Sequence, residues 1–135
     1  MSRLAQRLSE LRRYLDHLGQ LRARPISPEA LCSDLSLRND VVHSLLMVAQ
    51  MVIDIAGALS ASHALSFSDY REAVENLRQL GFPGSLVDHL ARLPGFLSVV
   101  LHRYLRLDEE RVLAALGELE PVEEFLSLVA GRLQA

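Results

Sequence analysis

Apolar positions recur at intervals of three and four residues through most of the chain. The first such series consists of Leu4, Leu8, Leu11, Leu15 and Leu18. This spacing places the five side chains on one face of a helix. It predicts a first amphipathic helix that ends near Gly19 or in the Arg24–Pro25 region.

A second helical region is expected from Ser27 to about Ser60. Ser27 is a good N-cap, and Pro28 follows it at the first helical position. A break near Ser33–Asp34 can divide this region. Its centre, VVHSLLMVAQMVIDIAGAL, is apolar on more than one face. That pattern indicates a helix that is central in a bundle, or that is also buried against another chain.

A third helix is expected after Ser66 or Ser68, either of which can cap it. Its apolar positions are Tyr70, Val74, Leu77 and Leu80.

The rest of the chain continues the helical pattern. A fourth region runs from about 85 to 107, with a kink or restart at Pro94–Gly95. Asp108 can cap a fifth helix, in which Pro121 marks a bend or the start of a sixth. No segment shows strand alternation. We therefore predict an all-α fold, a single domain over residues 1–135 with about five helices.

The composition agrees with a helical bundle and limits the compartments and kinds of ligand to be expected. Half of the residues are hydrophobic, only 5% are aromatic, and the net charge is −3, so no basic field indicates a nucleic-acid surface. The single cysteine, Cys32, favours a reducing cytoplasm. The longest uncharged apolar run, 44–53, is far shorter than the ~18 residues of a membrane span. No metal-ligand spacing or phosphate-binding glycine loop is present, so neither a metal nor another cofactor is expected.

The stretch GFLSVVLHRYLRLD, residues 95–108, places titratable groups in an otherwise apolar helix. Ser98, His102 and Arg106 are each four residues apart and form a narrow polar stripe beside the apolar one. His102 therefore lies at a border. It is either a boundary histidine satisfied by Ser98 or water, or a functional group.

This stretch resembles the signature helix of the HEPN superfamily, and most closely its HepT-like branch of bacterial toxins. The matching positions are Gly95, Phe96, His102, Tyr104 and Asp108. The segments VIDIAGALSA (52–61) and SFSDYREAVENLRQLGF (66–82) are similar to the second and third helices of that family.

The resemblance implies a metal-independent endoribonuclease, the toxin of a toxin–antitoxin system, with His102 as a catalytic residue. Leu97 stands where the family has its arginine, and Ser98 where it has its asparagine. The missing guanidinium would have faced the charge on the phosphate in the transition state. Whether the chain is an enzyme therefore stays open. The alternative is a catalytically inactive HEPN module that binds RNA or a nucleotidyltransferase.

The resemblance also implies partners. One is a minimal nucleotidyltransferase antitoxin of the MntA kind, which transfers AMP onto the tyrosine of the His-x-Tyr motif, here Tyr104. The other is a second copy of the chain. The family's arginine and histidine are five residues apart on one helix, so their side chains differ by about 140° in direction and cannot both point into a pocket made by that helix alone. Two such helices related by a twofold axis can line a shared cleft, each with one face.

Two further residues are candidates for lining that cleft. Arg106 lies on the stripe of His102, although a solvated arginine at a helix end is the simpler reading. Asp54 is either a cleft or dimer contact, or a buried carboxylate hydrogen-bonded to a neighbouring helix.

A second stretch, LRNDVVH (37–43), contains Arg38, Asn39 and His43 in a similar arrangement. It precedes the segment 52–61, and position 45, two after the histidine, is a leucine rather than a tyrosine. We expect these three residues to form the exposed face of the second helical region.

Overall fold

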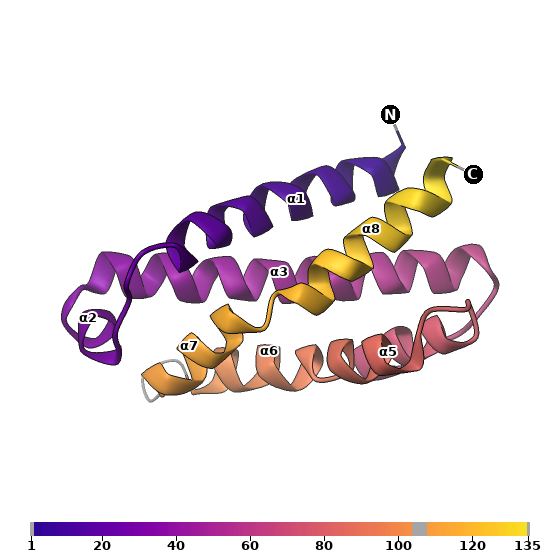
Figure 1. Cartoon of the computed structure of the whole chain (residues 1–135). Helices are drawn as coiled ribbons and strands as arrows, with labels where there is room; N and C mark the ends of the chain where they lie inside the picture. The colour runs from indigo at the N-terminus through magenta and orange to yellow at the C-terminus, as the bar shows by residue number, and fades with distance from the viewer. Residues whose placement is uncertain (1, 104–107, 135) are drawn as a thin grey trace.

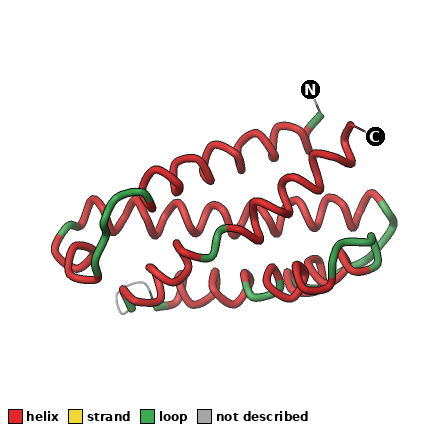
Figure 2. The backbone as a smooth tube through the Cα atoms, viewed as in Figure 1, coloured by secondary structure: helices red, strands yellow, loops and turns green. Residues whose placement is uncertain are grey.

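The computed structural model describes residues 2–103 and 108–134, and every regular element within these ranges is helical (Figures 1 and 2). The elements in chain order are α1 (Arg3–Arg22), α2 (Pro28–Ser33), α3 (Leu35–Ser62), α4 (Tyr70–Glu75), the 3-10 turn η1 (Asn76–Arg78), α5 (Gly84–Leu90), α6 (Leu93–His102), α7 (Glu109–Gly117) and α8 (Glu120–Gln134). The predicted all-α fold is confirmed.

The long helix α3 is the centre of the bundle. In Figure 1, α1 runs along one side of it, α5 and α6 run along the other, and α8 crosses in front. Its buried apolar residues come from more than one face and include Val41, Val42, Leu45, Val48, Val52, Ile53, Ile55 and Leu59. The central position predicted for this segment is therefore confirmed, since neighbouring helices cover several of its sides.

The expected break in the second helical region lies at Asp34, which separates α2 from α3. The Asp34 side chain accepts a hydrogen bond from the Leu37 backbone N–H (3.1 Å) and caps α3. Ser27 caps α2 in the same way, with a 3.1 Å bond from the Ala30 N–H. Such caps satisfy amide groups that the first helical turn leaves unpaired.

The prediction for the third helix was wrong in two respects. Its cap is Asp69, which accepts a 2.8 Å bond from the Glu72 N–H, whereas Ser68 donates to the Glu72 carboxylate. Tyr70 is 51% exposed rather than buried, because α4 begins at this residue and its inward face starts with Ala73 and Val74.

The fourth region consists of two helices, so the predicted restart is confirmed. The chain breaks after Leu90, and Pro94 lies in the first turn of α6, where a missing N–H costs no helical hydrogen bond. Asp108 caps α7 through a 2.9 Å bond from the Glu110 N–H. Pro121 lies in the first turn of a separate helix, α8.

The first and last helices are joined by an ion pair. The Arg12 guanidinium donates to both carboxylate oxygens of Glu123, at 2.7 and 2.6 Å. These bonds raise the pKa of Arg12 above its usual value. Helices α1 and α8 consequently pack against each other (Figure 1).

The end of α8 is also fixed to the turn that precedes α5. The Arg132 guanidinium lies 4.4 Å above the centre of the Phe82 ring and donates a hydrogen bond to the Leu80 carbonyl. Gly81, between these two contacts, has a φ of 88°, a conformation that favours glycine.

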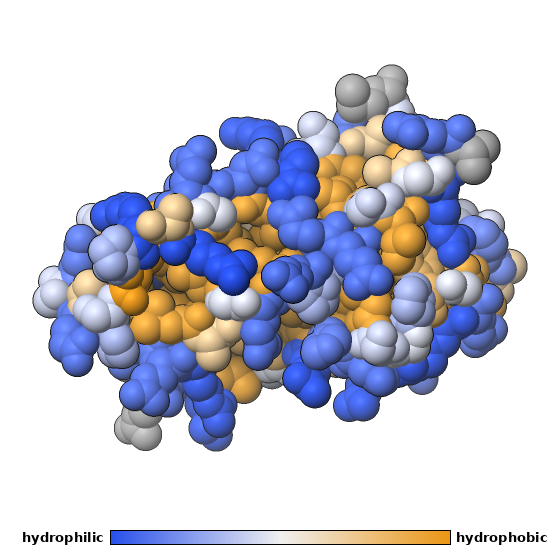
Figure 3. Space-filling model, viewed as in Figure 1, coloured by the Kyte–Doolittle hydropathy of each residue, from blue (hydrophilic) through white to orange (hydrophobic). Residues whose placement is uncertain are grey.

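By length and composition α3 could cross a membrane, which the count of uncharged residues did not predict. However, 56% of its most apolar 18-residue window is buried inside the bundle, as expected for a core helix. Hydrophilic residues cover much of the face seen in Figure 3, and hydrophobic residues show between them.

Candidate functional site

Helix α6 carries Gly95, Phe96 and His102 of the signature positions and has two different faces. Leu97 and Val100 are buried and belong to the hydrophobic core. Ser98 and His102, one turn apart, are exposed to solvent. The two described members of the predicted polar stripe, Ser98 and His102, therefore lie on the outer face of the helix.

Leu97, at the position of the family's arginine, is only 5% exposed. It lies five residues before His102, so the two side chains point about 140° apart on the helix. Leu97 therefore acts as a packing residue. This turn of α6 supplies no cation to a site at His102.

His102 is the last residue of α6, where the chain leaves the helix. Its ring has no hydrogen-bonded partner within residues 2–103 and 108–134, so Ser98 does not satisfy it, and the exposed ring is open to water. An exposed imidazole can accept or release a proton near neutral pH, which suits general acid–base chemistry. Tyr104 and Arg106, the two candidates that follow, lie outside the described residues.

An open groove of about 600 Å³ lies beside the C-terminal end of α6; we call it the α3–α6 groove. Its walls are Asn39, Asp40, Val42, His43 and Leu46 of α3 and Val100 and Leu101 of α6. Leu101, the neighbour of His102, is 61% exposed. The groove brings the LRNDVVH stretch to the end of the signature helix, which the sequence did not predict.

His43 stands on the edge of this groove. It is exposed, as expected, and its ring packs against Tyr14 of α1 in an edge-on arrangement with 6.3 Å between ring centroids. Asn39, one turn earlier, is exposed as well.

The expectation that Arg38 would also be exposed was wrong. Its side chain is only 14% exposed, and its Nη1 lies 2.8 Å from Glu109 Oε1. A largely desolvated guanidinium needs a partner, and the first turn of α7 supplies one. Arg38 therefore joins the start of α3 to the start of α7.

A polar cluster between α1 and α3 was missed by the sequence reasoning. His17 Nε2 lies 2.7 Å from Asp40 Oδ1, and the buried Ser44 hydroxyl donates to the same oxygen at 3.2 Å. Only the four-residue spacing of Asp40 and Ser44 was visible in the sequence. The histidine comes from another helix, and no spacing rule connects it to them.

Asp54 is exposed, which corrects the expectation of a buried carboxylate bonded to a neighbouring helix. It accepts a 2.9 Å hydrogen bond from Gln50 Nε2, one turn earlier on α3. The apolar run around Asp54 was misleading because this residue falls on the outer face of the central helix. In the part of the chain that the structure describes, no three His, Cys, Asp or Glu side chains are grouped to hold a metal ion.

Comparison with known proteins identifies the fold. The family described as "Ribonuclease HepT-like" matches residues 4–129. A tri-AMPylated HEPN toxin of Shewanella oneidensis, solved in complex with MNT antitoxin, superposes with a TM-score of 0.82 at 20% identity and covers 97% of this chain and 99% of its own.

A second solved structure, a toxin–antitoxin with AMP-PNP, gives a TM-score of 0.82 at 19% identity, with 95% of this chain and 97% of that chain covered. No curated protein matches the sequence. The family match spans nearly the whole chain and agrees with the signature residues on α6. The chain belongs to the HepT-like ribonuclease family.

Proposed function

We propose that this chain is the toxin half of a toxin–antitoxin pair and acts on RNA in the cytoplasm. The observation that carries the proposal is the exposed His102 at the end of α6, in a fold that matches a HEPN toxin over 97% of the chain.

The chemistry follows from the imidazole. His102 takes the proton of a ribose 2′-hydroxyl, whose oxygen then attacks the adjacent phosphorus, and the P–O bond to the next nucleotide breaks. The leaving 5′-oxygen takes up a proton, and no metal is required. The α3–α6 groove, which lies beside His102, offers a path for the strand.

A second candidate function is favoured by Leu97. With a buried leucine in place of the arginine, α6 supplies no cation for the phosphorane charge. By analogy with lost oxyanion-hole donors, this costs roughly 10²–10³ in rate. A module that binds RNA or a nucleotidyltransferase without cutting would keep this fold and this leucine.

The partner we propose is a minimal nucleotidyltransferase antitoxin of the MntA kind, with AMP transferred to Tyr104. The two solved relatives support this choice, because both are toxin–antitoxin structures and one is AMPylated. AMP on Tyr104 adds negative charge and bulk two residues from His102, which would repel RNA.

We also propose a twofold homodimer that uses α6 and the outer face of α3. The exposed Leu101 and the half-buried Leu46 give these helices apolar surface at the groove. In such a dimer, Asp54 and Arg106, the second of which lies outside the described residues, are the candidates for lining the shared cleft.

The nuclease proposal is tested with purified protein and a labelled RNA in the presence of EDTA. We expect slow cleavage that leaves 2′,3′-cyclic ends and is lost in His102→Ala but retained in His63→Ala, a control histidine at the far end of α3. If the wild type binds RNA and never cuts it, the binding module is the correct function.

The antitoxin proposal is tested by incubating the chain with a nucleotidyltransferase of this kind, ATP and magnesium. Each AMP adds roughly 329 Da, and peptide mapping should place it on Tyr104. Equal labelling of a Tyr104→Phe variant would remove Tyr104 from this role.

A further inference from the structure

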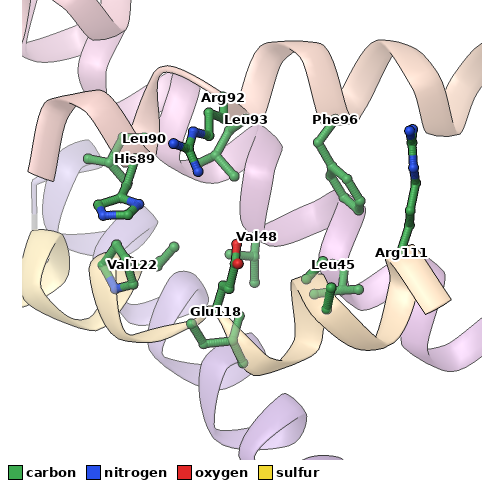
Figure 4. A pocket seen from close by; sticks show the side chains of 14 residues that line it. Leu45, Val48, His89, Leu90, Arg92, Leu93, Phe96, Arg111, Glu118 and Val122 are labelled. Atoms are coloured by element: carbon green, nitrogen blue, oxygen red, sulfur yellow. The ribbon is translucent and has the colours of Figure 1, made fainter.

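A cavity of about 260 Å³ lies on the inner side of α6, away from the face that carries His102 (Figure 4). Its apolar walls come from three directions: Leu45 and Val48 of α3, Leu93 and Phe96 of α6, and Val122 of α8. An apolar cavity of about 150 Å³ can hold a benzene molecule. This one therefore has room for a ring with a short chain attached.

The rim of the cavity is charged. Arg92 reaches it from the start of α6, and Arg111 reaches it from α7, beyond Phe96; the Glu118 carboxylate points toward the cavity below Arg92 (Figure 4). Across the residues that the structure describes, none of these three groups has an ion-pair partner within 4.0 Å. Arg92 interacts electrostatically with the Asp88 carboxylate, which balances part of its charge.

The arrangement of these charges selects one class of ligand. The Glu118 carboxylate lies below Arg92 and away from the Arg111 guanidinium (Figure 4). Arg111 is then the cation left for a bound group, and a planar guanidinium binds a carboxylate through two parallel hydrogen bonds.

We propose that this cavity binds a small molecule made of an apolar body, about one ring with a short chain, and one carboxylate. The body lies against Val48 and Phe96, and the carboxylate lies on Arg111. The volume excludes a peptide helix, which would need a longer groove. The ligand would also contact α6 through Phe96, which immediately precedes Leu97 in the helix that ends at His102.

The proposal does not depend on ribonuclease activity, so binding is measured directly. We use phenylbutyrate as the probe and phenylbutanol, which has the same apolar body without the charge, as its partner. Titration calorimetry on the full chain should show saturable binding of phenylbutyrate that is about tenfold or more tighter than that of phenylbutanol, as expected for a charge-assisted hydrogen bond. The Tm of the protein should rise as the occupancy of the site increases.

Three variants locate the site. Arg111→Met keeps the apolar stem and should remove the preference for phenylbutyrate. Arg22→Met removes the same charge from an exposed position on α1 and should leave it intact. Ala115→Leu, which fills the cavity from its half-buried wall, should abolish binding of both probes while circular dichroism still shows the folded bundle.

Several results would overturn the proposal. Equal affinity for the two probes, or a preference that survives Arg111→Met, would contradict the role of the carboxylate. Binding that survives Ala115→Leu would place the ligand elsewhere. If phenylbutyrate shows no saturable binding, the proposed class of ligand is wrong. The cavity would then accommodate a side chain of a partner protein instead.

Discussion

Leu97 and His102 occupy opposite sides of one short helix: Leu97 is 5% exposed and packs in the core, whereas His102 faces solvent. Five residues along α6 thus separate a packing role from a candidate chemical role. In this chain the position of the family's arginine contributes to stability.

The first prediction is that Leu97→Arg destabilises the fold. The guanidinium would replace a buried leucine and would lose hydration unless its stem reaches solvent. We expect a loss of about 2 kcal/mol or more in the free energy of unfolding, measured by urea denaturation. Leu97→Met, which nearly conserves volume, should cost less than about 1.5 kcal/mol.

The comparison between these two variants is informative in both directions. If Leu97→Arg is as stable as Leu97→Met, the guanidinium has found a path out of the core. The position could then serve as it does in the family, and RNA cleavage by Leu97→Arg would become the next measurement.

The second prediction concerns the homodimer. Light scattering on a size-exclusion column should give about twice the 15.0 kDa chain mass. Leu101→Asp places a charge on the 61% exposed leucine beside the groove and should shift the protein to monomer, because the interface would have to bury that carboxylate. Leu128→Asp on α8, an exposed leucine as well, serves as the control. A wild type that is monomeric at micromolar concentrations rules out the dimer.

The third prediction places RNA in the α3–α6 groove. His43→Ala should weaken RNA binding, because the imidazole on the groove edge offers a hydrogen bond and a surface for stacking. We expect a loss of about tenfold in affinity, taking about 1–3 kcal/mol for one base-stacking contact. Fluorescence anisotropy with a single-stranded RNA measures it. His63→Ala should leave affinity unchanged, and a similar loss in both variants would point to general charge instead.

The fourth prediction is a pH dependence of stability that arises at Arg78. Its guanidinium lies 2.6 Å from Glu75 and also bonds Asp88, and these hydrogen bonds lower the pKa values of both carboxyl groups below the ordinary 4.5 and 3.8. A lowered pKa in the folded state stabilises the fold above the ordinary pKa, and the effect is lost as the pH falls through the folded value.

The test is thermal unfolding of wild type and Arg78→Met from neutral pH down to pH 2. The wild type should be the more stable at neutral pH by a small margin, because all three groups are solvent-accessible. The gap in Tm should close below about pH 3.8. A gap that stays constant down to pH 2 would mean that Arg78 acts through packing alone.

Much of the fold could be predicted because it depends on local patterns. The leucine series of α1, the cap at Ser27 and the break at Asp34 each follow from residues within one or two turns. Tyr70 was misplaced because spacing alone does not show where a helix begins relative to its neighbour.

The candidate site was only partly predictable, since it depends on contacts between distant segments. The outward face of α6 followed from the spacing of Ser98 and His102. The burial of Arg38 against Glu109 did not, because 71 residues separate these two partners. The same holds for the groove that brings His43 to the end of α6.

The ion pair between Arg12 and Glu123 spans 111 residues and has a consequence for the order of folding. The apolar face of α1 is synthesised first, but α8, which covers part of it, is synthesised last. On the ribosome, the part of α1 that packs against α8 therefore stays uncovered until α8 emerges. We expect the folded bundle to form only after α8 is made, so that chains that still lack α8 would be targets for chaperones and proteases.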